Sequence, residues 1–273
     1  MFAVEDRERL RDELIAAAQA DARISAAALV GSSAMGPEDL WSDIDFAVCV
    51  DEDSQRQAVI AEWTERMYAN HAAVHHLDVP HGDAVYRVFL LADTLQVDLS
   101  FWPATQFGAT GPGFRLLFGD AVRTTATVAT PSATGLIGMA WLYALHARSA
   151  IPRGRVWQAE YMISGMRDHV LALACLRHGL PTVHGRGFDR LPREATASIE
   201  PALMQCLDIR ELKRAFATVT EALLSEVKLA EPALGDRLAD TLSPDPPVRA
   251  GGVAPTGGRR RVACSGAEER GRE

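Results

Sequence analysis

The first half of the chain alternates between helix-like and strand-like hydrophobic patterns. Apolar residues recur every three or four positions in residues 5–20 and 54–70, which predicts two amphipathic helices. Shorter apolar or alternating runs predict four strands, at residues 26–30, 44–50, 85–91 and 95–102. The short link between the last two strands predicts a hairpin. This order of elements is typical of a small mixed-sheet domain, which we place at residues 1–120.

The second half is patterned almost entirely for helices. Gly179 with Pro181 just beyond it is typical of a helix C-terminus, and Trp141 and Trp157 are expected in the core. We therefore expect an α+β protein, with an all-helical bundle domain at residues 121–241. Beyond it, residues 242–273 are rich in Pro, Gly and Arg and predict a disordered tail, in which the arginine run is solvated. Helices are predicted at residues 133–148, 156–179, 199–207 and 211–229.

Composition narrows the function classes. Apolar residues make up 48% of the 273 positions and charged residues 23%, the balance of an ordinary globular protein. A formal net charge of −8 argues against a stable nucleic-acid partner, because such domains carry basic surfaces. No apolar run is long enough to span a bilayer and none resembles a signal peptide, so a cytoplasmic protein is expected. Cys49 and Cys175 lie in apolar runs and are expected to be buried. The oligomeric state is left open.

Three aspartates carry the candidate chemistry. Asp43 and Asp45 are two positions apart where a predicted strand begins, so in extended backbone both side chains point to one face. Asp98 occupies the polar face of another predicted strand, which alternates strictly from residue 95 to 101. If the two strands are neighbours, three carboxylates converge at one end of the sheet. Hard oxygen ligands of this kind suit Mg²⁺, which would relieve the repulsion between them.

The same residues form part of a longer pattern. Gly31-Ser32, a polar loop, Asp43-Ile44-Asp45 and the later Asp98 together resemble the signature of the polymerase-β-like nucleotidyltransferase superfamily. The resemblance covers about residues 26–103. It implies that Asp43, Asp45 and Asp98 hold Mg²⁺, and that a turn formed by Gly31, Ser32 and Ser33 binds the phosphates of ATP or another NTP. Transfer at the α-phosphate needs the charge on the attacking and leaving oxygens to be neutralised, and bridged metal ions do this.

A helical domain after the transferase domain resembles the aminoglycoside nucleotidyltransferases. This resemblance implies transfer of AMP from ATP to a hydroxyl of a small-molecule acceptor, with pyrophosphate leaving. It also implies a carboxylate base on a helix of the second domain, for which Glu160 is the counterpart, with Arg167 touching phosphate. This chain has Ser164 where the relatives have a lysine. Glu160 is equally compatible with an exposed glutamate in the first turn of a helix, and Asp98 is then the alternative base.

Several alternatives stay open. The acceptor can be a partner protein, as for antitoxin-like nucleotidyltransferases, or the chain can bind nucleotides without catalysis. A histidine-rich segment at residues 71–81, expected to be a connector, offers zinc ligands or ordinary surface histidines. Trp41 can stack on a ring of a substrate or pack under its own loop.

Overall fold

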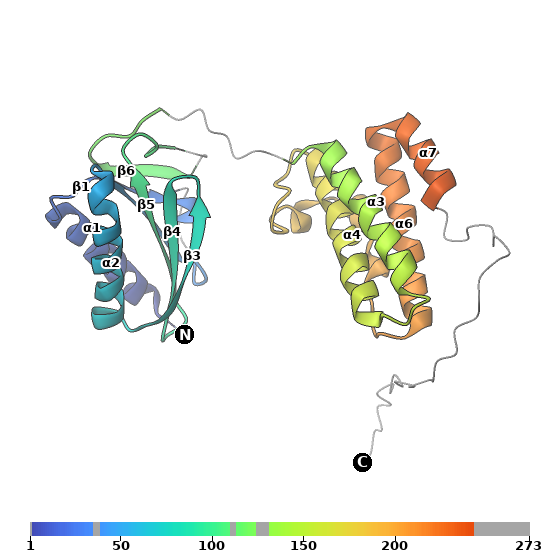
Figure 1. The fold of residues 1–273 in the computed structure, drawn as a ribbon, viewed down its shortest axis with the longest axis horizontal. Coiled ribbons are helices and arrows are strands. Elements are labelled where there is room, and N and C mark those ends of the chain that lie inside the picture. The colour runs from blue at the N-terminus through green and yellow to red at the C-terminus, as the bar shows by residue number, and fades with distance from the viewer. Residues whose placement is uncertain (1, 35–38, 110–112, 124–130, 243–273) are drawn as a thin grey trace, which may run out of the picture. The chain divides into compact units, whose positions relative to one another are not determined.

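The computed structural model describes residues 2–34, 39–109, 113–123 and 131–242, without the side chains of Ser32, Pro80 and His81. The chain divides into two units, Met1–Ala129 and Thr130–Glu273, each of which is described by itself. The first unit contains a mixed sheet with helices and the second is helical, which confirms the α+β class (Figure 1). The predicted disordered tail lies outside the described residues, apart from Leu242.

A six-stranded sheet forms the centre of the first unit. Its strands lie in the order β3-β4-β5-β2-β1-β6, in which β2 and β5 run parallel and the other neighbouring pairs are antiparallel. The parallel pair is therefore central. The strand bounds are β1 Ile24–Val30, β2 Ile44–Val50, β3 Ala73–His81, β4 Ala84–Leu91, β5 Gln96–Pro103 and β6 Phe114–Phe118.

The two faces of this sheet differ in the size of their side chains. Helices α1 (Val4–Ala20) and α2 (Asp53–Asn70) pack on one face, where large apolar residues form the main core (Figure 1). Trp63 of α2 lies between Phe46 and Phe101, with ring centroids 6.4 Å and 6.3 Å away. The opposite face has a smaller cluster, built largely of alanines with Trp102 and Phe107. Alternation along β2 and β5 places Asp45 and Asp98 on this second face.

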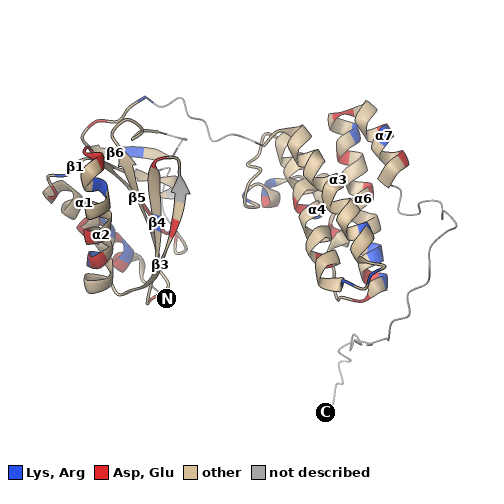
Figure 2. Ribbon diagram, viewed as in Figure 1, with Lys and Arg blue, Asp and Glu red and all other residues tan. Residues whose placement is uncertain are grey.

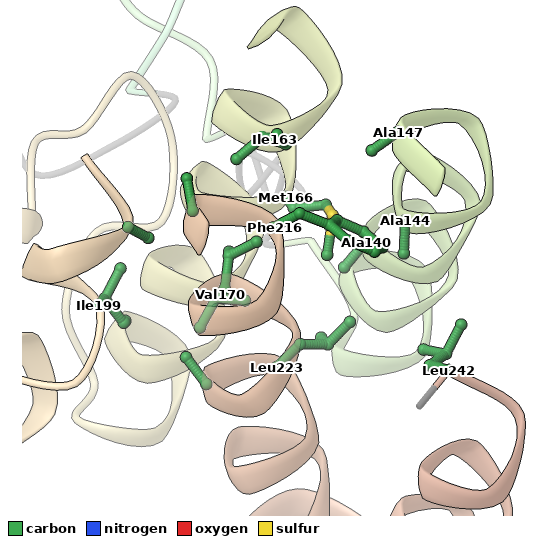
Figure 3. Packing of buried hydrophobic residues seen from close by; sticks show 14 of the residues in the cluster. Ala140, Ala144, Ala147, Ile163, Met166, Val170, Ile199, Phe216, Leu223 and Leu242 are labelled. Carbon is green, nitrogen blue, oxygen red and sulfur yellow. The ribbon is translucent and has the colours of Figure 1, made fainter. Parts of the chain in front are cut away.

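The second unit is a helical bundle. Its long helices are α3 Ala133–Ala150, α4 Val156–Arg177, α6 Ile209–Ala230 and α7 Pro232–Leu242, with short turns at η2 Phe188–Arg190, α5 Arg193–Thr196 and η3 Glu200–Ala202. Small residues of α3, including Ala140 and Ala144, face Met166 of α4 and Phe216 of α6 (Figure 3). Figure 2 shows α3 almost without charge, and Arg148 is its one charged residue. None of the described helices combines the length and the apolar character needed to cross a bilayer.

The predicted end of α4 is confirmed in detail. Gly179 has φ +66°, and its N–H donates to the carbonyl of Leu176 at 3.2 Å. The N–H of Leu180 donates to the carbonyl of Cys175 at 2.8 Å. These two bonds and the left-handed glycine form a Schellman motif, which satisfies carbonyls that the helix leaves unpaired.

Two expectations about local structure are wrong, and two elements of the structure were not predicted. Residues 199–207 do not form a helix: a single turn, η3, carries Pro201, and α6 begins at Ile209. Residues 73–81 form the edge strand β3 rather than a connector, and β6 was not predicted. The helix α7 was not predicted either, although its apolar side packs on α6.

Two tryptophans expected in the core are exposed. The side chain of Trp157 is 74% exposed and that of Trp141 is 38% exposed. The buried face of α3 consists mostly of alanines, because α4 packs close to it, and the indole of Trp141 lies outside that contact. The expectations for Cys49 and Cys175 are confirmed, since both are buried.

Candidate functional site

The structure brings the three predicted aspartates together. Asp43 directly precedes β2, Asp45 is the second residue of β2, and Asp98 lies on the parallel neighbour β5. In the register of this pair, Asp45 is directly opposite Asp98. One carboxylate oxygen of each aspartate lies within 4.8 Å of the other two, and all three residues are half-buried. Within the described part of the chain, these aspartates are the one group of three or more potential metal ligands.

The donor set fits a hard divalent cation. Three carboxylates on one face supply oxygen ligands, and their partial exposure leaves room for water or substrate oxygens to complete a shell. Burial raises the pKa of Asp98 above its ordinary value, and the nearby charge of Asp43 adds to this, while a hydrogen bond from Gln96 opposes it. The site therefore concentrates negative charge in a partly desolvated place, which a bound cation would neutralise.

A tight turn lies directly against Asp45. Residues Gly31–Ala34 form the turn η1 after β1, and Gly31 has φ +61°. A Cβ atom at Gly31 would lie 2.1 Å from Oδ2 of Asp45, so only glycine allows the turn to approach the carboxylate this closely. The N–H of Gly31 donates to the carbonyl of Gly113, 3.1 Å away, at the start of β6. The unpredicted strand β6 thus helps to hold the turn.

The two serines of this turn differ in what the structure describes. Ser33 is 6% exposed, and its hydroxyl has no hydrogen-bond partner among the described residues. A buried hydroxyl without a hydrogen-bond partner is uncommon in folded proteins. The side chain of Ser32 is outside the described set.

The segment before Asp43 is held by a buried arginine. Arg7 of α1 is 1% exposed, and its Nη1 donates to the carbonyl oxygens of Asp39 and Ser42 at 2.5 Å and 3.1 Å. Ser42 is the residue directly before Asp43, so this contact fixes the backbone that leads into the site. Trp41, in the same segment, is 73% exposed and does not pack under its loop.

Two further residues at the site were missed from the sequence. Gln96 donates from Nε2 to Oδ1 of Asp98 at 2.9 Å and to Oδ2 of Asp43 at 3.4 Å. Burial, and then the negative charge of Asp45, raise the pKa of Tyr86 to about 12. The alternation that placed Asp98 would also have placed Gln96, two positions earlier, on the same face. No comparable signal marks Tyr86, because it comes from the neighbouring strand β4.

Glu160 and Arg167 belong to the second unit, on α4. The hydroxyl of Ser164 donates to Oε1 of Glu160 at 2.8 Å, and Nη1 of Arg167 donates to the same hydroxyl at 3.4 Å. Arg167 also pairs with Asp168 at 2.9 Å. Glu160, Ser164 and Arg167 thus share one face of the helix, and Glu160 is half-buried there.

Among the residues that the structure describes, the histidine-rich segment contributes to no cluster of metal ligands. His75 and His76 lie in the edge strand β3. The ring of His76 contacts Tyr68 of α2, whose hydroxyl lies 2.9 Å from Nδ1 of that histidine. Asp78 pairs with Arg87 of β4. These contacts give His76 and Asp78 structural partners within the unit.

Comparison with known proteins gives a likeness of structure alone. No family model and no curated protein matches the sequence. An aminoglycoside 6-adenyltransferase from Bacillus subtilis is 12% identical over 85% of this chain and 95% of its own, with a TM-score of 0.36. A nucleotidyltransferase-like protein from Exiguobacterium sibiricum 255-15 is 15% identical over 85% of this chain and 78% of its own, with a TM-score of 0.37.

Proposed function

We propose that the protein is a Mg²⁺-dependent nucleotidyltransferase that transfers a nucleoside monophosphate from an NTP, in the first place AMP from ATP, to a hydroxyl of a small molecule. The observation that carries this proposal is the meeting of Asp43, Asp45 and Asp98 on one face of the sheet, with the Gly31 turn against Asp45. Three carboxylates in this place cost repulsion and desolvation, which a divalent cation would offset.

The residues have separate roles in this proposal. Asp43, Asp45 and Asp98 hold the cation, and the turn at Gly31, Ser32 and Ser33 receives the phosphates. When bound, the cation neutralises charge on the attacking and leaving oxygens. The acceptor hydroxyl attacks the α-phosphorus, the bond from that phosphorus to the bridging oxygen breaks, and pyrophosphate leaves with the bond electrons.

The proton of the acceptor hydroxyl needs a base. We propose Glu160 for this role, with Arg167 contacting phosphate, and Asp98 as the alternative. The hydrogen bond from Ser164 orients the Glu160 carboxylate and leaves its second oxygen available.

The test is transfer from α-labelled ATP by the purified chain with Mg²⁺, across a panel of hydroxyl compounds that includes aminoglycosides. Pyrophosphate release and a labelled product are expected together for a true acceptor. Asp43→Asn and Asp45→Asn should each abolish transfer and keep the far-ultraviolet circular dichroism of the wild type. Asp83→Asn is the matched control, because Asp83 is exposed in the same unit and bonds Gln106. Full activity in both site variants would exclude the proposed metal chemistry.

A further inference from the structure

Gln96 is placed between two of the three carboxylates. It is the first residue of β5 and lies two positions before Asp98, so both side chains occupy the same face. Because Ile44 pairs with Val97, the residues directly before them, Asp43 and Gln96, lie at the same end of this strand pair. One amide nitrogen, Nε2, reaches Oδ1 of Asp98 at 2.9 Å and Oδ2 of Asp43 at 3.4 Å.

The chemistry of a glutamine amide suits this position. Its nitrogen carries two N–H donors, enough to serve one oxygen on each carboxylate. An arginine or lysine here would also bridge the pair, but its positive charge would cancel the attraction for a cation. A neutral amide orients both carboxylates and leaves their full charge for the metal. The bond to Oδ1 of Asp98 leaves Oδ2 of that residue unclaimed by Gln96.

We propose that Gln96 is a positioning residue of the cation site. It fixes the rotation of the Asp98 carboxylate and ties that group to Asp43, so that the two carboxylates meet the ion together. The inference rests on the proposed function only in requiring that the aspartates bind a divalent cation. Hydrogen-bond partners of metal ligands commonly contribute about 10–100-fold to metal affinity.

The main competing explanation is an incidental surface hydrogen bond. Gln96 is exposed, and exposed glutamines often contact a nearby carboxylate without consequence. Gln106 provides the comparison within the same unit, because its Nε2 donates to Oδ2 of Asp83 at 2.7 Å, a bond of at least equal quality. The two explanations differ in what they predict for metal binding rather than for folding.

The experiment titrates Mn²⁺ into the full chain after removal of metal with a chelator, with binding followed by isothermal calorimetry and by the electron paramagnetic resonance of free Mn²⁺. Gln96→Leu keeps the size of the side chain and removes the donor, and its dissociation constant should rise about 10–100-fold. Gln96→Asn keeps the amide but shortens its reach, and should weaken binding similarly. Gln106→Leu should bind like the wild type, and urea midpoints should agree for all four proteins.

A second measurement separates positioning from general damage. At saturating Mn²⁺, Gln96→Leu should recover most of the wild-type kcat for transfer, because its defect is in metal occupancy. Wild-type affinity in either Gln96 variant would overturn the role of Gln96 and leave the metal site standing. Failure of the wild-type chain to bind Mn²⁺ would overturn both the metal site and the role of Gln96.

Discussion

Gly31→Ala perturbs the site through a single added methyl group. The new Cβ would lie 2.1 Å from Oδ2 and 2.9 Å from Cγ of Asp45. Ordinary carbon contacts begin at about 3.5 Å, so the Asp45 carboxylate would have to retreat by more than about 1 Å or the turn would have to open. Gly31 also has φ +61°, where an alanine costs about 1–2 kcal/mol.

The two effects have different consequences. The backbone cost lowers the free energy of unfolding, whereas the displacement of Asp45 acts on the metal site. A misplacement of about 1 Å in a catalytic group can cost on the order of 100-fold in rate. Gly31→Ala is therefore expected to remain folded, with stability reduced by about 1–2 kcal/mol and transfer reduced about 100-fold or more.

Gly82→Ala provides the matched control in the same unit. Gly82 has φ +60°, but the nearest atom to its added Cβ would be Oε1 of Gln106 at 3.6 Å, an ordinary contact. Urea unfolding should show a similar loss of stability in both variants, while Mn²⁺ binding and pyrophosphate release should fall only in Gly31→Ala. Wild-type transfer by Gly31→Ala, or an equal loss in Gly82→Ala, would refute the reasoning.

Three further predictions follow from single residues. Arg7→Met removes a buried donor to the Ser42 carbonyl, and should lower the free energy of unfolding by about 3 kcal/mol in urea titrations. Asp98 has a raised pKa, mainly from burial, so its ionisation destabilises the fold without metal. Asp98→Asn should therefore stabilise the chelator-treated protein at pH 7 in thermal unfolding, and this gain should disappear as the pH falls below about 3.9. Glu160→Gln keeps an oxygen acceptor for Ser164 and should slow transfer by about 10²–10⁴-fold with Mn²⁺ binding unchanged.

Each of these has a contrary outcome. An unchanged urea midpoint in Arg7→Met would mean that the backbone before Asp43 does not depend on this buried contact. A destabilised Asp98→Asn protein at pH 7 would contradict the direction of the pKa shift. Full transfer by Glu160→Gln would leave Asp98 as the proposed base.

Much of the first unit could be predicted because its pattern is local. Strict alternation around Asp98 and the apolar run after Asp43 specify strands and the face on which each carboxylate lies, since side chains alternate along a strand. The C-terminal end of α4 could also be predicted from the sequence, because glycine is the residue that the left-handed position after a helix favours.

Local patterns failed where the environment, rather than periodicity, selects the structure. Strand β3 lies at the edge of the sheet, so it tolerates polar histidines and Pro80, which obscure its alternation. Strand β6 is short and half exposed, and its pairing with β1 supplies the bonds that a lone five-residue segment lacks. Helical spacing around residue 203 was similarly misleading, because only the turn η3 forms there.

The sequence by itself identified the three aspartates as candidate metal ligands, the face to which each points, and Gly31 as part of a candidate phosphate-binding turn. The tertiary structure alone decided that β5 pairs with β2 in parallel, with Asp98 opposite Asp45. In the sequence, α2, β3 and β4 lie between these two strands. Their pairing depends on burying the large side chains beneath the helices, and local spacing does not encode this burial. The same long-range packing produces the contacts of Gln96 with the aspartates and of Arg7 with the backbone before Asp43. It also brings Gly31 close to Asp45.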